Sequence, residues 1–292
     1  MNLQGSLVAL VTPMDEQGAI DKAALSHLID WHLEANTQGF IIAGTTGECA
    51  TLNADEQFDL VSTVVRQVAG RVPVIAGTGT NCTHSTIKLS ENAKRAGADG
   101  CLIVTPYYNK PTQNGLYAHY KAVADKIDLP IILYNVPSRC ACDLLPETVE
   151  RLSQLKTIVG IKEATGKIER TQEIKQRCHD RFAVFSGDDA TALKLMIDGG
   201  AQGVISVTAN VAPEKMQALC QAALKGDVAT AEKLDKELSL LHQRLFIESN
   251  PTPTKWVLQQ MGKIKSGIRL PLLPLDRRYH DEVKNAMQQA GV

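Results

Sequence analysis

The sequence has no charge imbalance and no long apolar run. Its 31 Lys and Arg residues face 32 Asp and Glu residues, which leaves a formal net charge of -1. A chain without a positive excess has little to offset the phosphates of nucleic acid or an anionic membrane, so we expect neither as a partner. No apolar stretch approaches the roughly 18 residues that a membrane-spanning helix needs, and the first residues do not form a signal peptide, which favours a cytoplasmic protein.

The cysteines do not form a disulfide framework. They number seven, an odd count, and they are scattered along the chain, several within apolar segments. Cys140 and Cys142 form a C-x-C pair, but no second Cys or His cluster lies at ligand spacing, so we expect no metal. No stretch has the Gly-Lys-Ser/Thr ending of a phosphate-binding loop or the third glycine of a dinucleotide fingerprint, so a nucleotide cofactor is not supported.

Eight short runs rich in Val, Ile and Leu recur along the chain without strict alternation, which is typical of strands buried on both faces of a parallel sheet. Their starts are spaced about 28 residues apart on average, the length of a strand, a helix and two loops. Eight such units favour an α/β fold of the closed (β/α)8 TIM barrel type over an open doubly wound sheet, and we assign residues 1–224 to it. The runs begin near Leu7, Gly39, Pro73, Cys101, Pro130, Ile158, Phe182 and Gly203.

The segments between the runs carry helix signals. Asn53 begins the sequence NADE ahead of a periodic apolar stretch, which is the pattern of a capping box, and Gly70 is positioned as the glycine that ends this helix. Over 228–246, apolar residues are spaced alternately three and four apart, which predicts a long amphipathic helix. We assign residues 225–292 to a C-terminal helical extension that packs on the barrel or on a neighbouring subunit, with a free coiled coil as the minor alternative.

Lys162 is the sharpest functional signal, because the active site of a parallel barrel forms at the carboxyl ends of its strands. It ends the run that starts at Ile158, and alternation places it on the same side as Gly160. If that side faces the barrel axis, the ammonium is desolvated and its pKa falls, which favours a free amine that attacks a carbonyl group. The alternative is a rim ion pair with Glu163, a poor geometry because neighbours on a strand point to opposite faces.

Other strand ends supply groups that suit a small carboxylate substrate. Tyr134 ends the run that precedes the one with Lys162, so its phenol can shuttle protons there; the alternative is a core tyrosine bound to backbone. The GTTGE segment at 44–48 offers backbone N-H groups and hydroxyls to a carboxylate or small oxyanion. Arg139 can hold a substrate carboxylate with two hydrogen bonds, or it forms a salt bridge at the rim.

Two further segments follow strands. Tyr107 and Tyr108 lie side by side in a chain with only six tyrosines, so we favour a role in lining the site or in a subunit contact over an unassigned loop. In the segment SGDD at 186–189, the acids favour capping of the next helix over acid-base chemistry.

Six motifs, in order and at the predicted strand ends, resemble the dihydrodipicolinate synthase family, which belongs with the class I aldolases grouped with N-acetylneuraminate lyase. The resemblance runs from Gly5 to the C-terminal helices. It implies the condensation of pyruvate with L-aspartate 4-semialdehyde to 4-hydroxy-tetrahydrodipicolinate in diaminopimelate and lysine biosynthesis, without metal or organic cofactor. The motifs are GTTGE at 44, TPYYN at 105, YNVPSR at 134, GIKEATG at 160, SGDD at 186 and GVISVTAN at 203.

The resemblance also implies roles for individual residues. Lys162 matches the lysine that forms a Schiff base with pyruvate, and Tyr134 matches the proton-relay tyrosine. Thr45 and Tyr108 match the rest of the relay, with the tyrosine contributed by a partner subunit, which implies at least a dimer and commonly a dimer of dimers. The matching substrate positions are Thr46 with Thr45 at the pyruvate carboxylate, Arg139 at the carboxylate of the semialdehyde, and Gly187, Asp188 and Ile205 along the same pocket.

We expect regulation by lysine to be weak or absent. In family members that lysine inhibits, Ala54, Gln57 and Ser85 are matched by two histidines and a glutamate. The missing glutamate removes the carboxylate that would pair with the ammonium of lysine. The positions that match this allosteric site, at the tight dimer interface, are Cys49, Ala50, Ala54, Gln57, Asn81, Ser85 and Tyr107.

Two other functions stay open. A lyase of the same superfamily that acts on a sugar acid would keep the imine chemistry, but Arg139 after YNVPS suits a semialdehyde carboxylate better than a polyol. A non-catalytic barrel that binds pyruvate would require a broken relay, and the sequence shows no broken member.

Overall fold

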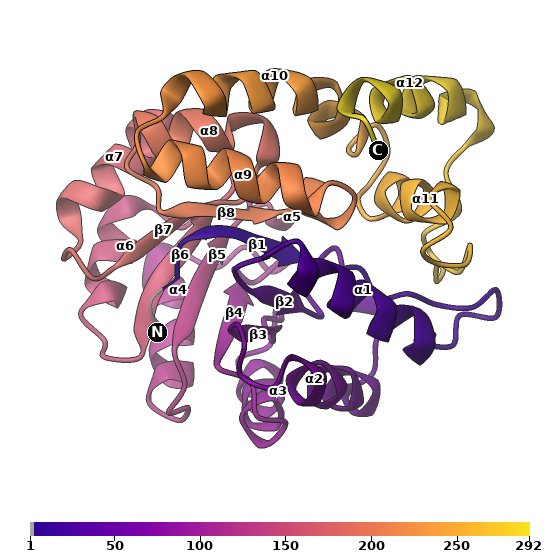
Figure 1. The fold of residues 1–292 in the computed structure, drawn as a ribbon. Coiled ribbons are helices and arrows are strands. Elements are labelled where there is room, and N and C mark those ends of the chain that lie inside the picture. Colours follow the sequence, from indigo (N-terminus) through magenta and orange to yellow (C-terminus); the bar gives the residue numbers. More distant parts are fainter. Residues whose placement is uncertain (1–2) are drawn as a thin grey trace.

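The computed structural model describes residues 3–292 and contains a closed barrel of eight parallel strands in chain order (Figure 1). The last strand pairs with the first and closes the barrel. Each predicted apolar run overlaps one strand, so the predicted barrel is confirmed. The strands are β1 (Gly5–Ala9), β2 (Phe40–Ile42), β3 (Val74–Gly77), β4 (Gly100–Val104), β5 (Ile131–Asn135), β6 (Ile158–Glu163), β7 (Ala183–Ser186) and β8 (Gly203–Ser206).

Helices alternate with the strands and surround the barrel (Figure 1). Two short 3-10 turns, η1 (Cys49–Thr51) and η2 (Thr208–Asn210), lie in the loops after β2 and β8. The helices of this part are α1 (Lys22–Glu34), α2 (Ala54–Val68), α3 (Thr83–Arg95), α4 (Gln113–Ala124), α5 (Pro137–Cys140), α6 (Pro146–Ser153), α7 (Ile168–Arg177), α8 (Asp189–Ile197) and α9 (Pro213–Leu224).

Helix α2 begins as its sequence predicts and ends one residue early. The Asn53 side chain accepts a bond from the N-H of Glu56, and the Glu56 carboxylate accepts one from the N-H of Asn53 at 3.0 Å, so the capping box is present. The prediction that Gly70 caps the other end is wrong. Ala69 takes the left-handed cap conformation at φ 50, and Gly70 continues it at φ 74. A glycine was therefore not required at the cap itself.

The barrel interior is filled by alternate strand residues that form a separate apolar cluster from the one between sheet and helices. Close packing between β6 and β7 requires glycine at position 160, because a Cβ there would lie 2.5 Å from the carbonyl oxygen of Ala183. This glycine lies two residues before Lys162 on the same face of β6. The interior cluster contains Leu3, Leu7, Ala9, Ile41, Ile75, Leu102, Ile132, Tyr134, Val136, Cys140, Phe185 and Ile205.

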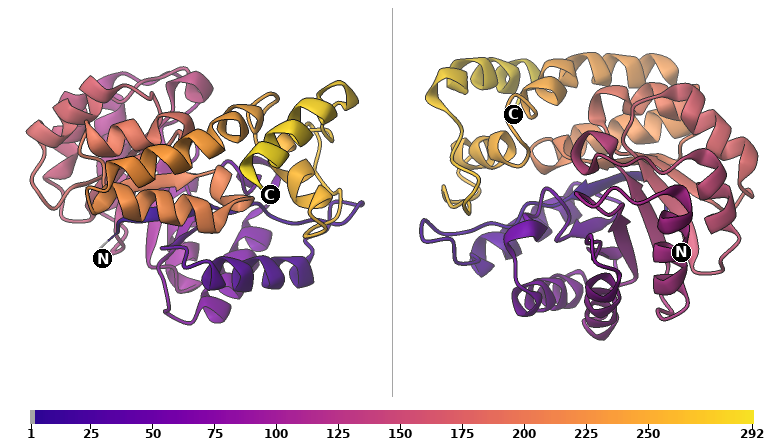
Figure 2. Two further views of the ribbon diagram at one scale, coloured as in Figure 1. Left: turned by 45° about the horizontal axis from the view of Figure 1, so that its top comes forward. Right: turned by 180° about the vertical axis from the view of Figure 1, so that it is seen from behind.

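The C-terminal part is helical, as predicted, and its helices gather on one side of the barrel (Figures 1 and 2). Helix α10 packs against α8, α9 and α12, with Leu238, Leu241 and Leu245 buried. The boundary after residue 224 stays a prediction. Within residues 3–292, no helix is long and apolar enough to cross a membrane. The elements are α10 (Val228–Arg244), α11 (Thr252–Gln260), η3 (Arg277–Tyr279) and α12 (His280–Ala290).

Candidate active site

Lys162 lies on the inner face of the barrel beside Tyr134, its register partner on β5. Only 5% of Lys162 is exposed, and its Nζ lies 4.5 Å from the centroid of the Tyr134 ring. Glu163 points to the opposite side, where its carboxylate accepts bonds from Asn135 at 3.1 Å and from the N-H of Thr165 at 2.7 Å. The alternative of a Lys162–Glu163 ion pair at the rim is therefore wrong, for the alternation reason given above.

The buried ammonium of Lys162 has no carboxylate partner. It makes no salt bridge within the described residues 3–292. Burial, opposed by the charge of Asp189 and aided by that of Arg139, lowers its pKa to about 8. At neutral pH, roughly one molecule in ten then carries the free amine, far more than an exposed lysine would supply. The site therefore contains a nucleophilic amine.

Gly187 makes room for the side chain of Lys162. A Cβ at this position would lie 3.0 Å from Cε of Lys162 and 2.7 Å from Cβ of Ala164. Any larger residue would displace the lysine stem, so the close approach explains why this predicted site position is a glycine.

The phenol of Tyr134 stays protonated over the whole working range of pH. Burial raises its pKa to about 12, partly offset by the positive charge of Arg139 and by the Thr45 side chain. No backbone group within residues 3–292 hydrogen-bonds its hydroxyl, which disfavours the reading of Tyr134 as a core tyrosine. A protonated phenol close to an amine and a threonine is suited to passing protons between them.

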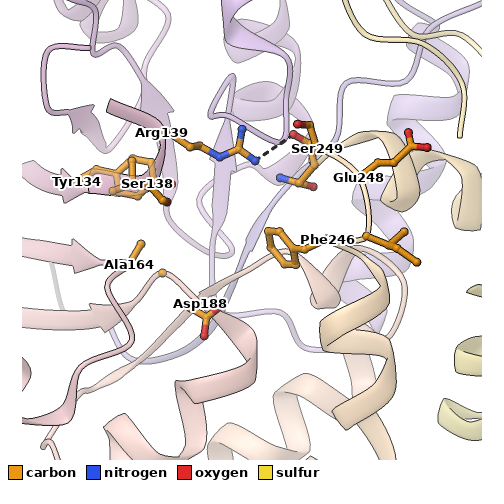
Figure 3. Close-up of a pocket in the computed structure, with 12 residues that line it drawn as sticks. Tyr134, Ser138, Arg139, Ala164, Asp188, Phe246, Glu248 and Ser249 are labelled. Atoms are coloured by element: carbon orange, nitrogen blue, oxygen red, sulfur yellow. Dashed lines mark hydrogen bonds between the residues drawn. The ribbon is translucent and has the colours of Figure 1, made fainter. Parts of the chain in front are cut away.

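A small inner cavity of about 30 Å³ lies at Lys162 and shares part of its lining with an open outer cavity of about 510 Å³. Figure 3 shows the residues that line the outer cavity. The inner cavity is also lined by Thr45 and Thr46, so the predicted carboxylate segment does meet the lysine. Both cavities share Tyr134, Arg139, Gly187, Phe246 and Asn250. The outer cavity is lined in addition by Val136, Ser138, Ala164, Asp188, Ile247, Glu248 and Ser249.

Arg139, on α5, is exposed at the mouth of the outer cavity. Its Nη2 donates a bond of 3.4 Å to the carbonyl oxygen of Asn250 (Figure 3). It forms no salt bridge with any carboxylate of residues 3–292, so the rim ion pair considered from the sequence is not formed. Most of its donors remain open to a ligand carboxylate.

The C-terminal part supplies one wall of the site, which our sequence reasoning missed. Asn250 donates from Nδ2 to Oγ1 of Thr46 at 2.9 Å, and Thr254 donates to Oδ1 of Asn250 at 3.1 Å. Phe246 and Asn250 line the inner cavity. The only sequence signal was the polar segment ESNP at 248–251 after the apolar helix stripe, which gave no partner.

A buried ion pair fastens the GTTGE segment to the same C-terminal part. Glu48, which ends the segment with a left-handed φ of 58, pairs with Lys255 of α11 and accepts a bond from the N-H of Arg269 at 3.1 Å. The hydroxyl of Thr12 donates to the carbonyl oxygen of Gly47 at 2.7 Å. These contacts fix the loop that carries Thr45 and Thr46.

Two other predicted positions fall in different places. Asp188 lines the outer cavity, and its carboxylate caps α8 by accepting bonds from the N-H and hydroxyl of Thr191 at 3.1 and 2.7 Å, as the sequence favoured. Ile205 is fully buried in the interior cluster and does not line either cavity. Alternation along β8 places it one layer below Val207, which lines the inner cavity, so a substrate contact by Ile205 stays a prediction.

Tyr108 does not line the site of its own chain. It is 89% exposed, with a φ of 75, on the loop after β4. A role at Lys162 therefore requires a second copy of the chain. Tyr107 is 39% exposed beside it, and the N-H of Asn109 bonds its carbonyl oxygen at 3.0 Å.

The predicted allosteric positions occupy three successive loops and helix starts, after β2, β3 and β4. The Gln57 side chain is turned inward, and its amide donates to the carbonyl oxygen of Gly77. Burial raises the pKa of the Cys49 thiol to about 11. No acid replaces the missing glutamate among Cys49, Ala50, Ala54, Gln57, Asn81, Ser85 and Tyr107.

The barrel, the desolvated lysine at its strand ends and the phenol beside it are the features of a class I aldolase, an enzyme that works through a lysine Schiff base. The chain belongs to the dihydrodipicolinate synthetase family, whose family model matches residues 2–290. This agrees with the resemblance read from the motifs.

Individual relatives match over the whole chain. The 4-hydroxy-tetrahydrodipicolinate synthase of Methylococcus capsulatus is 57% identical over 99% of both chains. The chloride-inhibited dihydrodipicolinate synthase of Acinetobacter baumannii, solved with pyruvate, is 48% identical, with a TM-score of 0.98 and full coverage of both chains. The dihydrodipicolinate synthase of Cyanidioschyzon merolae, solved with lysine bound, is 35% identical, with a TM-score of 0.95 over 99% of this chain and 98% of the other.

Proposed function

We propose that this protein is a 4-hydroxy-tetrahydrodipicolinate synthase, which condenses pyruvate with L-aspartate 4-semialdehyde in the biosynthesis of diaminopimelate and lysine. The observation that carries the proposal is the Lys162 amine, which is buried without a carboxylate partner beside the phenol of Tyr134. Relatives with this name align over nearly the whole chain. One of the aligned structures contains pyruvate.

Imine formation is the first step. Pyruvate enters the inner cavity with its carboxylate on the backbone and hydroxyls of Thr45 and Thr46. The free amine of Lys162 attacks the ketone carbon, a C-N bond forms, and the ketone oxygen leaves as water. Tyr134, with Thr45 and the Tyr108 of a partner copy, carries the protons that this exchange requires.

Carbon-carbon bond formation follows. The protonated imine withdraws electrons, the methyl group of pyruvate loses a proton, and the resulting enamine carbon attacks the aldehyde carbon of the semialdehyde. Arg139 holds the carboxylate of the semialdehyde at the mouth of the outer cavity, where its guanidinium is open. The amino group of the same substrate then attacks the imine carbon, which closes the ring and frees Lys162.

The rival reading, a lyase for sugar acids, is less well supported. The guanidinium of Arg139 at the cavity mouth suits the carboxylate of the semialdehyde better than a neutral polyol chain, and the aligned relatives carry the synthase name. Turnover of pyruvate with aspartate semialdehyde, compared with turnover with sugar aldehydes, separates the two. A preference for the sugar aldehyde would overturn the assignment.

The trans role of Tyr108 makes the active unit at least a dimer, and we propose a dimer of dimers in the cytoplasm. The support is the exposure of Tyr107 and Tyr108 on one loop, away from the site of their own chain. Sedimentation velocity of the full chain tests the assembly state.

Reduction with borohydride in the presence of pyruvate, followed by peptide mapping, tests the chemistry directly. A pyruvyl adduct on Lys162 is the expected result, because hydride fixes the C=N bond as a stable amine. Labelling of another lysine, for example Lys255, would overturn the mechanism.

A further inference from the structure

Asp189 holds a buried carboxylate at the start of α8. It is 2% exposed and stands at the first helical position, directly after the Asp188 cap. Its Oδ1 accepts a bond of 2.5 Å from the hydroxyl of Ser206, and its Oδ2 accepts bonds of 2.8 and 3.0 Å from the N-H groups of Val207 and Thr208. The carboxylate therefore joins α8 to the end of β8.

Every one of these three donors is neutral. Within residues 3–292, Asp189 forms no salt bridge, although buried carboxylates usually have a cationic partner. The hydrogen bonds and the amino end of α8 are suited to a carboxylate, but neither supplies a full positive charge. The protein thus keeps a fixed negative charge in its interior next to the active site.

The functional group on which that charge acts is Lys162. Glu163 of β6 is paired with Ser186 of β7, and the chain then turns over Gly187, whose Cα lies against the Lys162 stem, before it reaches Asp189. The charge of Asp189 opposes the effect of burial on the amine. Asp189 also accepts a bond from the N-H of Val207, which lines the inner cavity together with Lys162, so its carboxylate lies behind the wall of the cavity that holds the reacting nitrogen.

We propose that Asp189 is an electrostatic positioning residue that supplies the fixed counter-charge for the protonated imine on Lys162 and holds Val207 at the inner cavity. The inference rests on the proposed function. The free amine is neutral, but the protonated imine carries a full positive charge in a desolvated cavity. Relative to the free amine that reacts, a preorganised negative charge therefore favours the state in which the C-N bond has formed.

The other titratable groups near this pair are accounted for. Tyr134 and Arg139 face Lys162 from β5 and α5. Cys220 of α9 lies near Asp189, and burial, aided by that charge, raises the pKa of its thiol. On α10, Nδ1 of His242 lies 2.8 Å from the hydroxyl of Thr208, and its Nε2 lies 3.8 Å from Asp235. None of these groups forms an ion pair with Asp189 in the described part of the chain.

The test compares Asp189→Asn with Ser206→Ala in the full-length protein. The asparagine keeps the size and an acceptor oxygen but removes the charge, whereas the alanine removes one hydrogen bond and keeps the charge. For each, the rate of borohydride-trapped adduct formation is measured against pH with pyruvate alone, together with the fraction trapped at equilibrium.

For Asp189→Asn, we expect the acid limb of the rate profile to move to lower pH by about half a unit or more, because the pKa of Lys162 falls further. Above about pH 8, where the resting amine is neutral, we also expect the trapped fraction at limiting pyruvate to fall about threefold or more, because the protonated imine loses its counter-charge. Ser206→Ala should leave the pH profile in place. If the asparagine variant does not fold, Asp189→Ser serves instead, because it also removes the charge and is smaller.

A lower melting temperature with an unshifted pH profile would show that Asp189 acts only in stabilising the fold, and this would overturn the inference. Failure of both Asp189→Asn and Asp189→Ser to fold would overturn it as well. A wild-type adduct on Lys162 together with an unshifted variant overturns only this inference. Absence of any wild-type adduct on Lys162 overturns the proposed function as well.

Discussion

Two buried lysines in this chain have opposite surroundings. Lys162, inside the barrel, and Lys255, on α11, are 5% and 4% exposed. Lys255 is paired with the buried carboxylate of Glu48, whereas Lys162 faces the ring of Tyr134 and forms no ion pair within residues 3–292. Burial lowers the pKa of both amines, but Glu48 opposes that effect at Lys255 through both its charge and a hydrogen bond.

The difference shows how one residue type serves structure in one place and chemistry in another. A paired ammonium stays charged and joins two segments, here the GTTGE loop and the C-terminal helices. An ammonium that is desolvated without a partner gives up its proton more easily and becomes a nucleophile. Burial alone therefore does not distinguish Lys162, which we propose as the nucleophile, from Lys255; burial without an ion pair does.

The largest expected effect is that of Lys162→Ala. Removal of the nucleophile should lower kcat/KM by about 10⁴-fold or more and abolish the borohydride adduct. The melting temperature should stay near or above that of the wild type, because an unpaired buried charge is removed. Activity and trapping measurements, with circular dichroism as the folding control, check this. An adduct that persists in the variant would show that another amine reacts.

Lys255→Met should instead act on stability. It leaves the Glu48 carboxylate buried without its cation, which costs about 3 to 5 kcal/mol of unfolding free energy. Urea denaturation measures the loss. The matched control is the double variant Lys255→Met with Glu48→Gln, which removes both charges and should recover most of it. If Lys255→Met were as stable as the wild type, the proposed structural role of Lys255 would be contradicted.

Arg139→Ala should chiefly weaken the binding of the second substrate, aspartate semialdehyde. Loss of a charge-assisted contact to a carboxylate costs about 1.5 to 3 kcal/mol, so we expect KM for aspartate semialdehyde to rise about 10- to 100-fold. Adduct formation between pyruvate and Lys162 should change less, with a pH profile that moves to higher pH because Arg139 no longer lowers the pKa of Lys162. Steady-state kinetics with each substrate varied in turn checks the split, and an equal rise in both KM values would contradict it.

The pH dependence of imine formation sharpens the comparison. With a pKa of about 8, the neutral fraction of Lys162 rises with pH, so the rate of adduct formation should increase roughly tenfold from pH 7 to pH 9 and then level off. The same shift makes the unfolded chain bind more protons between about pH 8 and pH 10.4, so the contribution of Lys162 to stability rises through that window. A flat rate profile over this range would contradict the assignment.

The smallest expected effect is inhibition of the reaction by free lysine, whose ammonium would also need a carboxylate partner. Gln57 is turned toward Gly77, and neither Ala54 nor Ser85 supplies a carboxylate. By analogy with Lys255, an ammonium without a carboxylate partner binds poorly, so millimolar lysine should slow the reaction less than about twofold. A submillimolar inhibition constant in steady-state assays would contradict this.

Local patterns accounted for much of the barrel. Apolar runs located the strands, and the capping box of Asn53 and Glu56 located a helix start, because both depend on residues close in the chain. Helix ends were less certain: Ala69 took the cap position expected of Gly70, since a left-handed residue is permitted there even with a side chain. The pairing of Lys162 with Tyr134 followed from strand alternation and chain order.

The remainder of the site depended on contacts between distant segments. Asn250 donates a hydrogen bond to Thr46, and Lys255 pairs with Glu48, across separations of about 200 residues. No local sequence pattern predicts contacts between residues so far apart. The sequence reading assigned Asp189, together with Asp188, to capping of α8, and for Asp189 this is wrong because its carboxylate binds the end of β8 instead.

Short-range spacing encodes the alternation of strands and helices and the face of β6 on which the lysine stands, and the resemblance of six motifs indicated the family. The folded chain was needed to show which buried charges are paired and that the C-terminal part lines the candidate site. It was also needed to show that Tyr108 is exposed and does not line the site of its own chain. Solvation and ion pairing depend on the surroundings in three dimensions, and those are set by segments that lie far apart along the chain.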